Sequence, residues 1–197
     1  MSITLTGHTS GIGKSIGKLF ENKGYKVFGF SRTNGFDLEK NFEKMLSNII
    51  TTDSDIFINN AYVVDNQTKL LKKVYQEWKF KNKLIINIGS IASIIPPNHP
   101  DYGVEYVKNK REQREFCQEH NFLYSKTNFN KIKCGLVNVN CDYVNTPFKS
   151  KYDKRKFPNL SSNEVAEVIS FIIECFNKNI CIREINLHST KNPILIK

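Results

Sequence analysis

Tyrosines that stand four residues ahead of a lysine are the feature of this sequence best suited to chemistry. Residues four apart on a helix share a face, so the lysine ammonium can lie near the phenol. A cation within about 4–6 Å lowers a phenol pKa from about 10 by roughly 1–3 units, which makes the tyrosine a usable general acid and base. The composition predicts about one such pair by chance. Three occur: Tyr75/Lys79, Tyr106/Lys110 and Tyr152/Lys156.

A second feature is the segment ITLTGHTSGIGKSIGKLF, residues 3–20, in which an apolar stretch runs into three glycines and then a helical pattern. The first-turn N–H groups of such a helix, with the positive end of its dipole, suit a phosphate. Gly7 would let the chain leave the strand sharply, and Gly11 would let a pyrophosphate approach the backbone. Gly13 would let the helix pack closely on the sheet.

The elements that must position these residues follow from apolar alternation and turn residues. Strands are predicted at 3–6, 25–31, 55–59, 84–88, 133–140 and 180–187. Helices are predicted at 12–23, 38–50, 66–81, 102–120 and 162–177, the last with Ser161 or Ser162 as its N-cap. Alternating strands and helices predict an α/β fold, a parallel sheet with helices on both faces, in a single domain over residues 1–197.

This layout selects one tyrosine–lysine pair. Only Tyr106 follows a strand ending in serine and begins a long helix before another strand. Tyr75 lies inside a helix beside Trp78, where core packing is the better interpretation, and Tyr152 lies in a basic loop.

The motifs, in their order along the chain, resemble those of the short-chain dehydrogenase/reductase family, with its Rossmann-like doubly wound sheet. They are TGHTSGIG at 6–13, NNA at 59–61, INIGS ending at Ser90, YVKNK at 106–110 and YVNTPF at 143–148. The resemblance implies that Tyr106 is the catalytic acid and base, Lys110 also binds the nicotinamide ribose, and Ser90 hydrogen-bonds the substrate oxygen. It implies cofactor contacts from Gly7, Thr9, Ser10, Gly11, Ile12, Gly13, Asn59, Asn60, Ala61, Val144 and Thr146.

Alternatives remain for several of these residues. Ser90 could merely cap a turn, Tyr106 could merely cover the core, and Tyr102 competes for the catalytic role although no lysine follows it at the right spacing. The resemblance also implies a catalytic asparagine that supports a water relay to the lysine. Asn66 is the nearest candidate, unless it caps the helix that follows.

The end of the second predicted strand bears on the choice of nicotinamide. A free ribose 2′-hydroxyl is commonly held by an acidic residue there, whereas a 2′-phosphate requires a cation. The strand ends with Ser31 and Arg32, which favours NADP(H) over NAD(H). Asp37 and Leu38 resemble the family's adenine-contacting pair, and Asp37 could equally cap the next helix.

The chain departs from the family pattern at four places. Only 24 residues separate Ser31 from Asp55, so a strand is predicted to be missing and the sheet to have six strands. Cys141 and Asp142 replace a Pro-Gly pair. The segment REQREF after Lys110 replaces small apolar residues on a helix through which the family dimerises. The loop 148–159 is short and basic. It is either a lid that favours an anionic substrate or helps to hold the cofactor phosphates, or an ordinary solvated loop.

Composition limits the remaining possibilities. The net charge of +10 comes from 24 lysines and five arginines scattered along the chain, so a solvated basic surface is favoured over nucleic-acid binding. Five cysteines without a CxxC pair indicate reduced thiols and no metal cluster. No signal-peptide pattern or membrane-length apolar run occurs, so a cytoplasmic location is the default expectation.

The sequence thus predicts an NADP(H)-dependent oxidoreductase that acts on a small carbonyl or alcohol compound. A homodimer or homotetramer is the assembly expected for it. The alternatives are a non-catalytic NADP(H)-binding sensor or regulatory protein on the same fold, and a nucleic-acid-associated protein.

Overall fold

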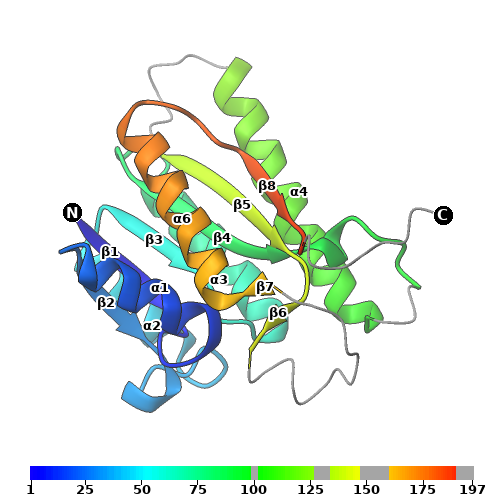
Figure 1. Ribbon diagram of the computed structural model, residues 1–197, viewed down its shortest axis with the longest axis horizontal. Coiled ribbons are helices and arrows are strands. Elements are labelled where there is room, and N and C mark those ends of the chain that lie inside the picture. The colour runs from blue at the N-terminus through cyan, green and yellow to red at the C-terminus, as the bar shows by residue number, and fades with distance from the viewer. Residues whose placement is uncertain (99–101, 127–133, 147–159, 190–197) are drawn as a thin grey trace.

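The centre of the structure is a parallel sheet of six strands with the order β2-β1-β3-β4-β5-β8 (Figure 1). The computed structural model describes residues 1–98, 102–126, 134–146 and 160–189. The predicted absence of one family strand is confirmed, because the chain between β2 and β3 holds only one α-helix. The strands are β1 (Ser2–Thr6), β2 (Lys26–Phe30), β3 (Ile56–Asn59), β4 (Leu84–Ser90), β5 (Gly135–Cys141) and β8 (Glu184–Leu187).

Helices cover both faces of this sheet, which confirms the doubly wound architecture (Figure 1). Strand β3 shows why, since Ile56 and Ile58 pack into one core cluster and Phe57 into the other. The first cluster holds α1 (Gly11–Asn22) and α6 (Ser162–Asn177) against the sheet. The second holds α2 (Phe42–Thr52), α3 (Val64–Trp78) and α4 (Val104–Lys126).

Several element ends differ from the predicted ones. Helix α2 begins at Phe42 rather than at residue 38, because the Asp37 carboxylate accepts hydrogen bonds from the Glu39 and Lys40 amides and forms a separate turn. Strand β8 begins at Glu184 rather than at residue 180, and α3 begins at Val64 rather than at residue 66. Helix α6 begins as predicted, with Ser161 and Glu164 forming a capping box.

Four short elements complete the described part of the fold near the carboxyl ends of the strands. Two 3₁₀ turns, η1 (Arg32–Asn34) and η2 (Ile91–Ser93), follow β2 and β4 directly. A small parallel pair of β6 (Val144–Asn145) and β7 (Leu160–Ser161) joins the segment after β5 to the start of α6.

The glycine turn between β1 and α1 depends on backbone geometry that only glycine meets easily. Gly7 and Gly11 have φ angles of 70° and 52°, in the left-handed region. A Cβ on Gly13 would lie 2.2 Å from the Gly7 carbonyl oxygen and 2.7 Å from Asn60 Nδ2. The helix can therefore sit this close to the turn only without a side chain at residue 13.

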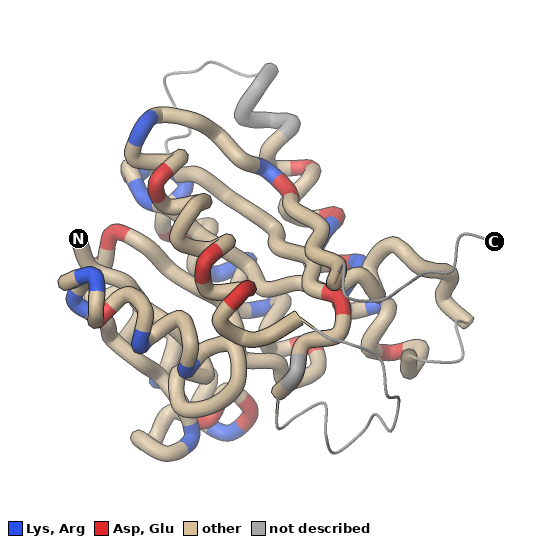
Figure 2. Tube along the Cα trace, viewed as in Figure 1, with Lys and Arg blue, Asp and Glu red and all other residues tan. Residues whose placement is uncertain are grey.

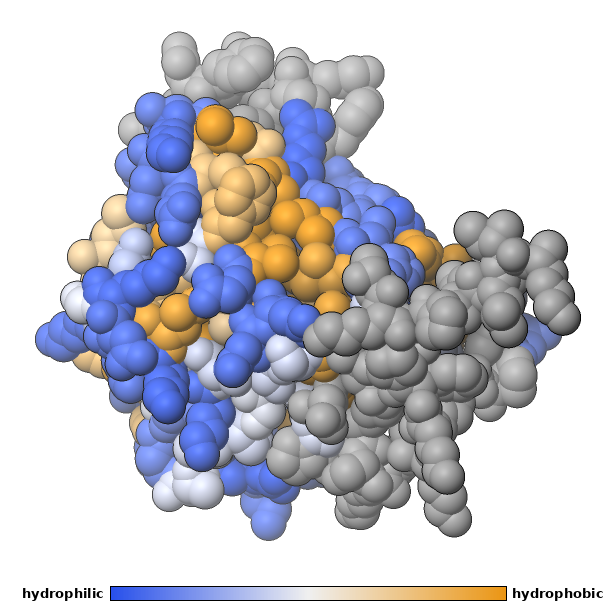
Figure 3. Space-filling model, in the orientation of Figure 1, coloured by the Kyte–Doolittle hydropathy of each residue, from blue (hydrophilic) through white to orange (hydrophobic). Residues whose placement is uncertain are grey.

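Charge and hydropathy are distributed differently over the surface. Figure 2 shows lysines and arginines on most elements with acidic residues between them, which matches their scatter in the sequence. Figure 3 shows apolar side chains gathered over the region of α6 and β8, where Phe171 and Ile180 are more than half exposed. Such patches often mark protein contacts, and the homo-oligomer stays a prediction.

No helix in the described ranges combines the length and apolarity needed to span a bilayer.

Candidate active site

Ser90, Tyr106 and Lys110 come together at the carboxyl edge of the sheet. Ser90 is the last residue of β4, and its hydroxyl oxygen accepts a hydrogen bond from the Ala92 amide at 3.2 Å. Tyr106 lies in the first turn of α4, and its side chain is hydrogen-bonded to that of Ser90. Lys110 follows one turn later on the same helix, with its Nζ 5.7 Å from the centroid of the Tyr106 ring. Ser90 thus both caps the η2 turn and contacts the tyrosine.

The Lys110 ammonium is buried, and it has three hydrogen-bond acceptors. Its Nζ donates to Gln67 Oε1 at 2.7 Å, to the Ile88 carbonyl at 3.2 Å and to Gln113 Oε1 at 3.3 Å. Burial lowers the pKa of Lys110 to about 7, and the electrostatic interaction with Cys141 acts in the opposite direction. An ammonium has three N–H donors, so these acceptors can satisfy all of them.

Lys110 was expected to lower the pKa of Tyr106, but the pKa of Tyr106 is raised in this structure. Burial raises the pKa of Tyr106 to about 12, and the hydrogen bond to Ser90 offsets this only in part. The reason is that the lysine N–H groups point to amide and carbonyl oxygens rather than to the phenol oxygen. Tyr106 therefore holds its proton at neutral pH, which is the form a general acid needs.

Two further tyrosines contact the Tyr106 ring, and a third stacks on one of them. Tyr62 contacts it edge-on at 5.0 Å between ring centroids, and Tyr102 stacks on it at 6.1 Å. Tyr143, which follows β5, stacks in turn on Tyr102 at 5.8 Å. Burial raises the pKa of Tyr102, and the Lys110 ammonium lies over the Tyr62 and Tyr106 rings. The contact with Lys110 favours Tyr106 over Tyr102 as the candidate catalytic tyrosine.

Asn66 is not brought to the lysine. It lies within the first turn of α3 rather than at its cap, and its Nδ2 donates to the Leu38 carbonyl at 3.0 Å. The next residue, Gln67, points in a different direction and contacts Lys110. Gln67 rather than Asn66 thus contacts the lysine in this structure, because successive helical side chains are turned by about 100°.

A buried row of amides lies behind the lysine, and only Asn59 of its members was among the predicted site residues. Asn59, Asn87 and Asn138 are direct neighbours across β3, β4 and β5. Asn59 Nδ2 donates to Asn87 Oδ1 at 2.9 Å, and Asn87 Nδ2 donates to Asn138 Oδ1 at 2.8 Å. The signal was present in the sequence: the strands INIG and LVNVN carry asparagine among buried residues, and a buried amide needs partners.

The predicted phosphate-binding turn has the form a diphosphate requires. No side chain caps α1, its first turn holds no acidic residue, and Thr9 and Ser10 are exposed. A Cβ on Gly11 would lie 3.1 Å from Thr146 Cγ2, so Thr146 lies against the turn. Ile12 instead packs on the core. The residues present therefore fit the cofactor phosphates.

The NNA segment holds this turn in place. The Thr6 hydroxyl oxygen accepts hydrogen bonds from the Asn60 and Ala61 amides at 2.9 and 3.0 Å. Asn60 Nδ2 donates to the Thr6 carbonyl at 2.9 Å, while Val144 is buried in the small pair of strands. The segment couples β1 to β3 beside the glycines.

The end of β2 presents hydroxyl groups and a cation. Ser31 is buried, and its hydroxyl is 2.8 Å from that of Thr33, while Arg32 is exposed. Asp37 is occupied by its own turn, and Leu38 is in the core. The basic loop 148–159 and Tyr152 lie outside the described residues.

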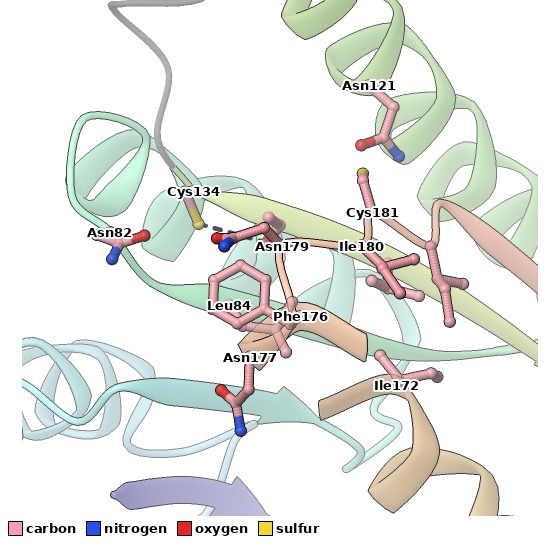
Figure 4. Close-up of a pocket in the computed structure, with 13 residues that line it drawn as sticks. Asn82, Leu84, Asn121, Cys134, Ile172, Phe176, Asn177, Asn179, Ile180 and Cys181 are labelled. Carbon is pink, nitrogen blue, oxygen red and sulfur yellow. Dashed lines mark hydrogen bonds between the residues drawn. The ribbon is translucent and has the colours of Figure 1, made fainter. Parts of the chain in front are cut away.

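A separate hollow of about 310 Å³ lies at the other edge of the sheet, at the amino ends of β4 and β5 (Figure 4). Cys134, Cys181 and Asn179 are among its lining residues, and none of the three candidate catalytic residues is. All five cysteines are unpaired, and four are buried. Burial raises the pKa of Cys134 to about 12, so this thiol stays protonated at neutral pH. Tyr75 is in the core, as predicted.

Comparisons with known proteins identify the fold. No family model and no curated protein matches this sequence. A 3-ketoacyl-(acyl-carrier-protein) reductase from Brucella melitensis, complexed with NADH, is similar in structure with a TM-score of 0.76 at 15% identity, over 96% of this chain and 97% of that one. An alcohol dehydrogenase from Thermococcus sibiricus, complexed with 5-hydroxy-NADP, gives 0.70 at 18% identity over 97% of each.

A third structure carries the family name. An oxidoreductase of the short-chain dehydrogenase/reductase family from Burkholderia thailandensis gives a TM-score of 0.72 at 13% identity, over 94% of this chain and 90% of that one. The predicted resemblance in fold is thereby confirmed: the chain has the Rossmann-like fold of short-chain dehydrogenases/reductases.

Proposed function

We propose that this chain, residues 1–197 acting as one domain, is an oxidoreductase that moves a hydride between NADP(H) and a small carbonyl or alcohol substrate. The observation that carries the proposal is the hydrogen-bonded Ser90–Tyr106 pair with the Lys110 ammonium beside it, at the same sheet edge as an uncapped glycine turn. The structural neighbours with bound NADH or 5-hydroxy-NADP support it.

The glycine turn, against which Thr146 lies, would hold the cofactor phosphates. Lys110 would bind the nicotinamide ribose. A bound nicotinamide supplies the hydride. The chain's own residues handle the proton: the Tyr106 hydroxyl, protonated at neutral pH, donates to the substrate oxygen, and the Ser90 hydroxyl donates a hydrogen bond to that same oxygen. The Lys110 charge then stabilises the phenolate left behind.

A substitution of the tyrosine tests this function. Tyr106→Phe should lower turnover of NADPH with reactive aldehydes and ketones by about 10²–10⁴-fold while NADPH still binds, because only the transferable proton is lost. Tyr75→Phe is the matched control, since Tyr75 also stands four residues before a lysine but lies in the core. Equal turnover in wild type and Tyr106→Phe would remove the proposal.

Preference for NADP(H) is part of the proposal and has its own test. The end of β2 offers the Ser31 and Thr33 hydroxyls and the exposed Arg32 guanidinium to a 2′-phosphate. Arg32→Ala should weaken NADPH binding by about tenfold, the value of one charge-assisted contact, and leave NADH binding nearly unchanged. Fluorescence titration measures both, and equal affinities for the two nucleotides in wild type would contradict the preference.

A second candidate is a protein that binds NADP(H) without turnover. The observation in its favour is that the Lys110 N–H groups all have acceptors within the protein. NADPH fluorescence enhancement together with no oxidation of NADPH by any carbonyl compound would favour this candidate.

A further inference from the structure

Helix α4 carries a buried glutamine where the resemblance led us to expect a small apolar residue. Gln113 stands three residues after Lys110 and has no exposed surface. Burying an amide without partners is costly, so a glutamine at this place must be hydrogen-bonded to be tolerated. Its contacts therefore indicate what it does.

Gln113 and Gln67 hold the same ammonium from two helices. Gln113 Oε1 accepts from Lys110 at 3.3 Å, and Gln67 Oε1 accepts at 2.7 Å. The two amides are also joined to each other, because Gln113 Nε2 donates to Gln67 Oε1 at 3.2 Å and to Thr68 Oγ1 at 3.1 Å. Neither oxygen can turn away from the lysine without breaking a second bond.

The amide orientations are held from behind by the sheet. Gln67 Nε2 donates to the Asn59 and Ile88 carbonyls at 3.0 and 3.1 Å. Asn87 Nδ2 donates to Gln113 Oε1 at 3.2 Å as well as to Asn138. Donors and acceptors thus fix which atom of each glutamine faces the ammonium.

This row continues to the far strand of the sheet. Asn138 Nδ2 donates to Asn140 Oδ1 at 2.8 Å, and Asn140 Nδ2 donates to Glu184 Oε1 at 3.0 Å. Arg114, on the same helix as Gln113, forms an ion pair with Glu184 at 2.8 Å. The network therefore joins α4 to β8 as well as to α3.

The groups that face Lys110 include no carboxylate in the described part of the chain. The titratable groups around it are Tyr62 from the segment after β3, Tyr106 from α4 and Cys141 from β5. Helix α3 contributes Gln67 and strand β4 the Ile88 carbonyl. Neutral oxygens, rather than a counter-ion, thus surround the ammonium.

We infer that Gln113 and Gln67 are positioning residues: their side-chain oxygens hold the Lys110 ammonium beside Tyr106 by direct contact. The inference rests on the proposed function for the role of Lys110 in turnover. The contact itself does not, so it can be tested in the protein without cofactor.

The first experiment follows the titration of Lys110 by NMR, in protein labelled with ¹³C at lysine Cε and free of nucleotide. The Lys110 signal is the one missing from Lys110→Met. It should titrate near pH 7, far below ordinary lysines at about 10.4. Gln113→Leu removes an acceptor of the charged form and should shift the midpoint down by about one pH unit. Gln113→Glu keeps the acceptor, adds a negative charge and should shift it up.

The matched control is Gln76→Leu. Gln76 accepts a hydrogen bond from Lys79 at 2.8 Å, which is the same lysine-to-glutamine contact at an exposed position. It should leave the Lys110 midpoint unchanged. Because Gln113→Glu is close in shape to the wild type, it remains a test even if Gln113→Leu does not fold. A Lys110 midpoint that stays the same in Gln113→Glu would overturn the inference.

The second experiment measures the pH dependence of turnover. If protonated Lys110 is needed, activity falls as pH rises through its pKa, so the alkaline limb should move down in Gln113→Leu and up in Gln113→Glu. If Gln113 served only stability, its replacement would lower activity equally at all pH values. Shifts in the NMR midpoint without any turnover in wild type would support the positioning role and reject the proposed function, so the two can fail separately.

Discussion

Adding one methyl group to the first turn of α1 is the sharpest test of the glycine turn. In Gly13→Ala the new Cβ would lie 2.2 Å from the Gly7 carbonyl oxygen and 2.8 Å from its carbonyl carbon. Both are backbone atoms, so no side chain can rotate to make room. Either α1 or the turn between β1 and α1 has to move.

The magnitude follows from a comparison with Gly17→Ala on the same helix. A Cβ at Gly17 meets only Leu5 Cδ2, at an ordinary 3.8 Å. Alanine is favoured over glycine inside a helix by about 0.5–1 kcal/mol, so Gly17→Ala should be stabilising by roughly that amount. Gly13→Ala gains the same preference but carries an overpacking cost of about 1–3 kcal/mol. The free energies of unfolding of the two variants should therefore differ by about 1–3 kcal/mol.

Urea unfolding of both variants measures this difference, and NADPH titration measures its effect on the site. Gly13→Ala should also bind NADPH at least tenfold more weakly, because the displaced turn no longer directs its N–H groups correctly. Gly17→Ala should bind as wild type does. Equal free energies of unfolding for the two variants would refute the packing argument, and wild-type NADPH affinity in Gly13→Ala would refute the assignment of the turn.

Two further predictions concern the amide row and the lysine. In Gly89→Ala the new Cβ would lie 2.8 Å from Asn140 Oδ1 and 2.9 Å from Asn138 Oδ1. Displacing these amides should lower the free energy of unfolding, measured in urea, by about 1–3 kcal/mol. An unchanged free energy of unfolding would show that the amides can move without loss of stability. Burial lowers the pKa of Lys110 to about 7 from 10.5, so between these values the unfolded chain binds more protons than the folded one, and this residue makes stability rise with pH. Lys110→Met removes that contribution. The free energy of unfolding of Lys110→Met, taken relative to that of the wild type, should therefore fall from about pH 7 to about pH 9, by at most about 1.4 kcal/mol per pH unit. A difference that does not depend on pH would contradict the buried charge.

Much of the fold could be predicted because its signals are local. The glycines at 7, 11 and 13, the capping box of α6 and the six strands follow from residue types at short spacing. The missing strand follows from chain length alone, since 24 residues accommodate one helix and its connections but not two helices and a strand. The order of the motifs was enough to predict that Ser90, Tyr106 and Lys110 lie together at one edge of the sheet.

The partners of Lys110 could not be predicted in the same way. Asn66 and Gln67 are adjacent and both polar, and only the rotation of α3 about its axis decides which faces the lysine. The asparagines of β3, β4 and β5 form a row only because parallel pairing aligns them, although many residues separate them in the sequence.

The sequence by itself determined the order of the elements and the residues able to carry chemistry, because strand and helix periodicity, glycine geometry and capping act over a few neighbouring residues. Only the tertiary structure decided the protonation of the site. Burial raises the pKa of Tyr106 to about 12 and lowers that of Lys110 to about 7. The free energy of a charge depends on the water removed from it and on the acceptors brought to it, and both come from segments distant along the chain.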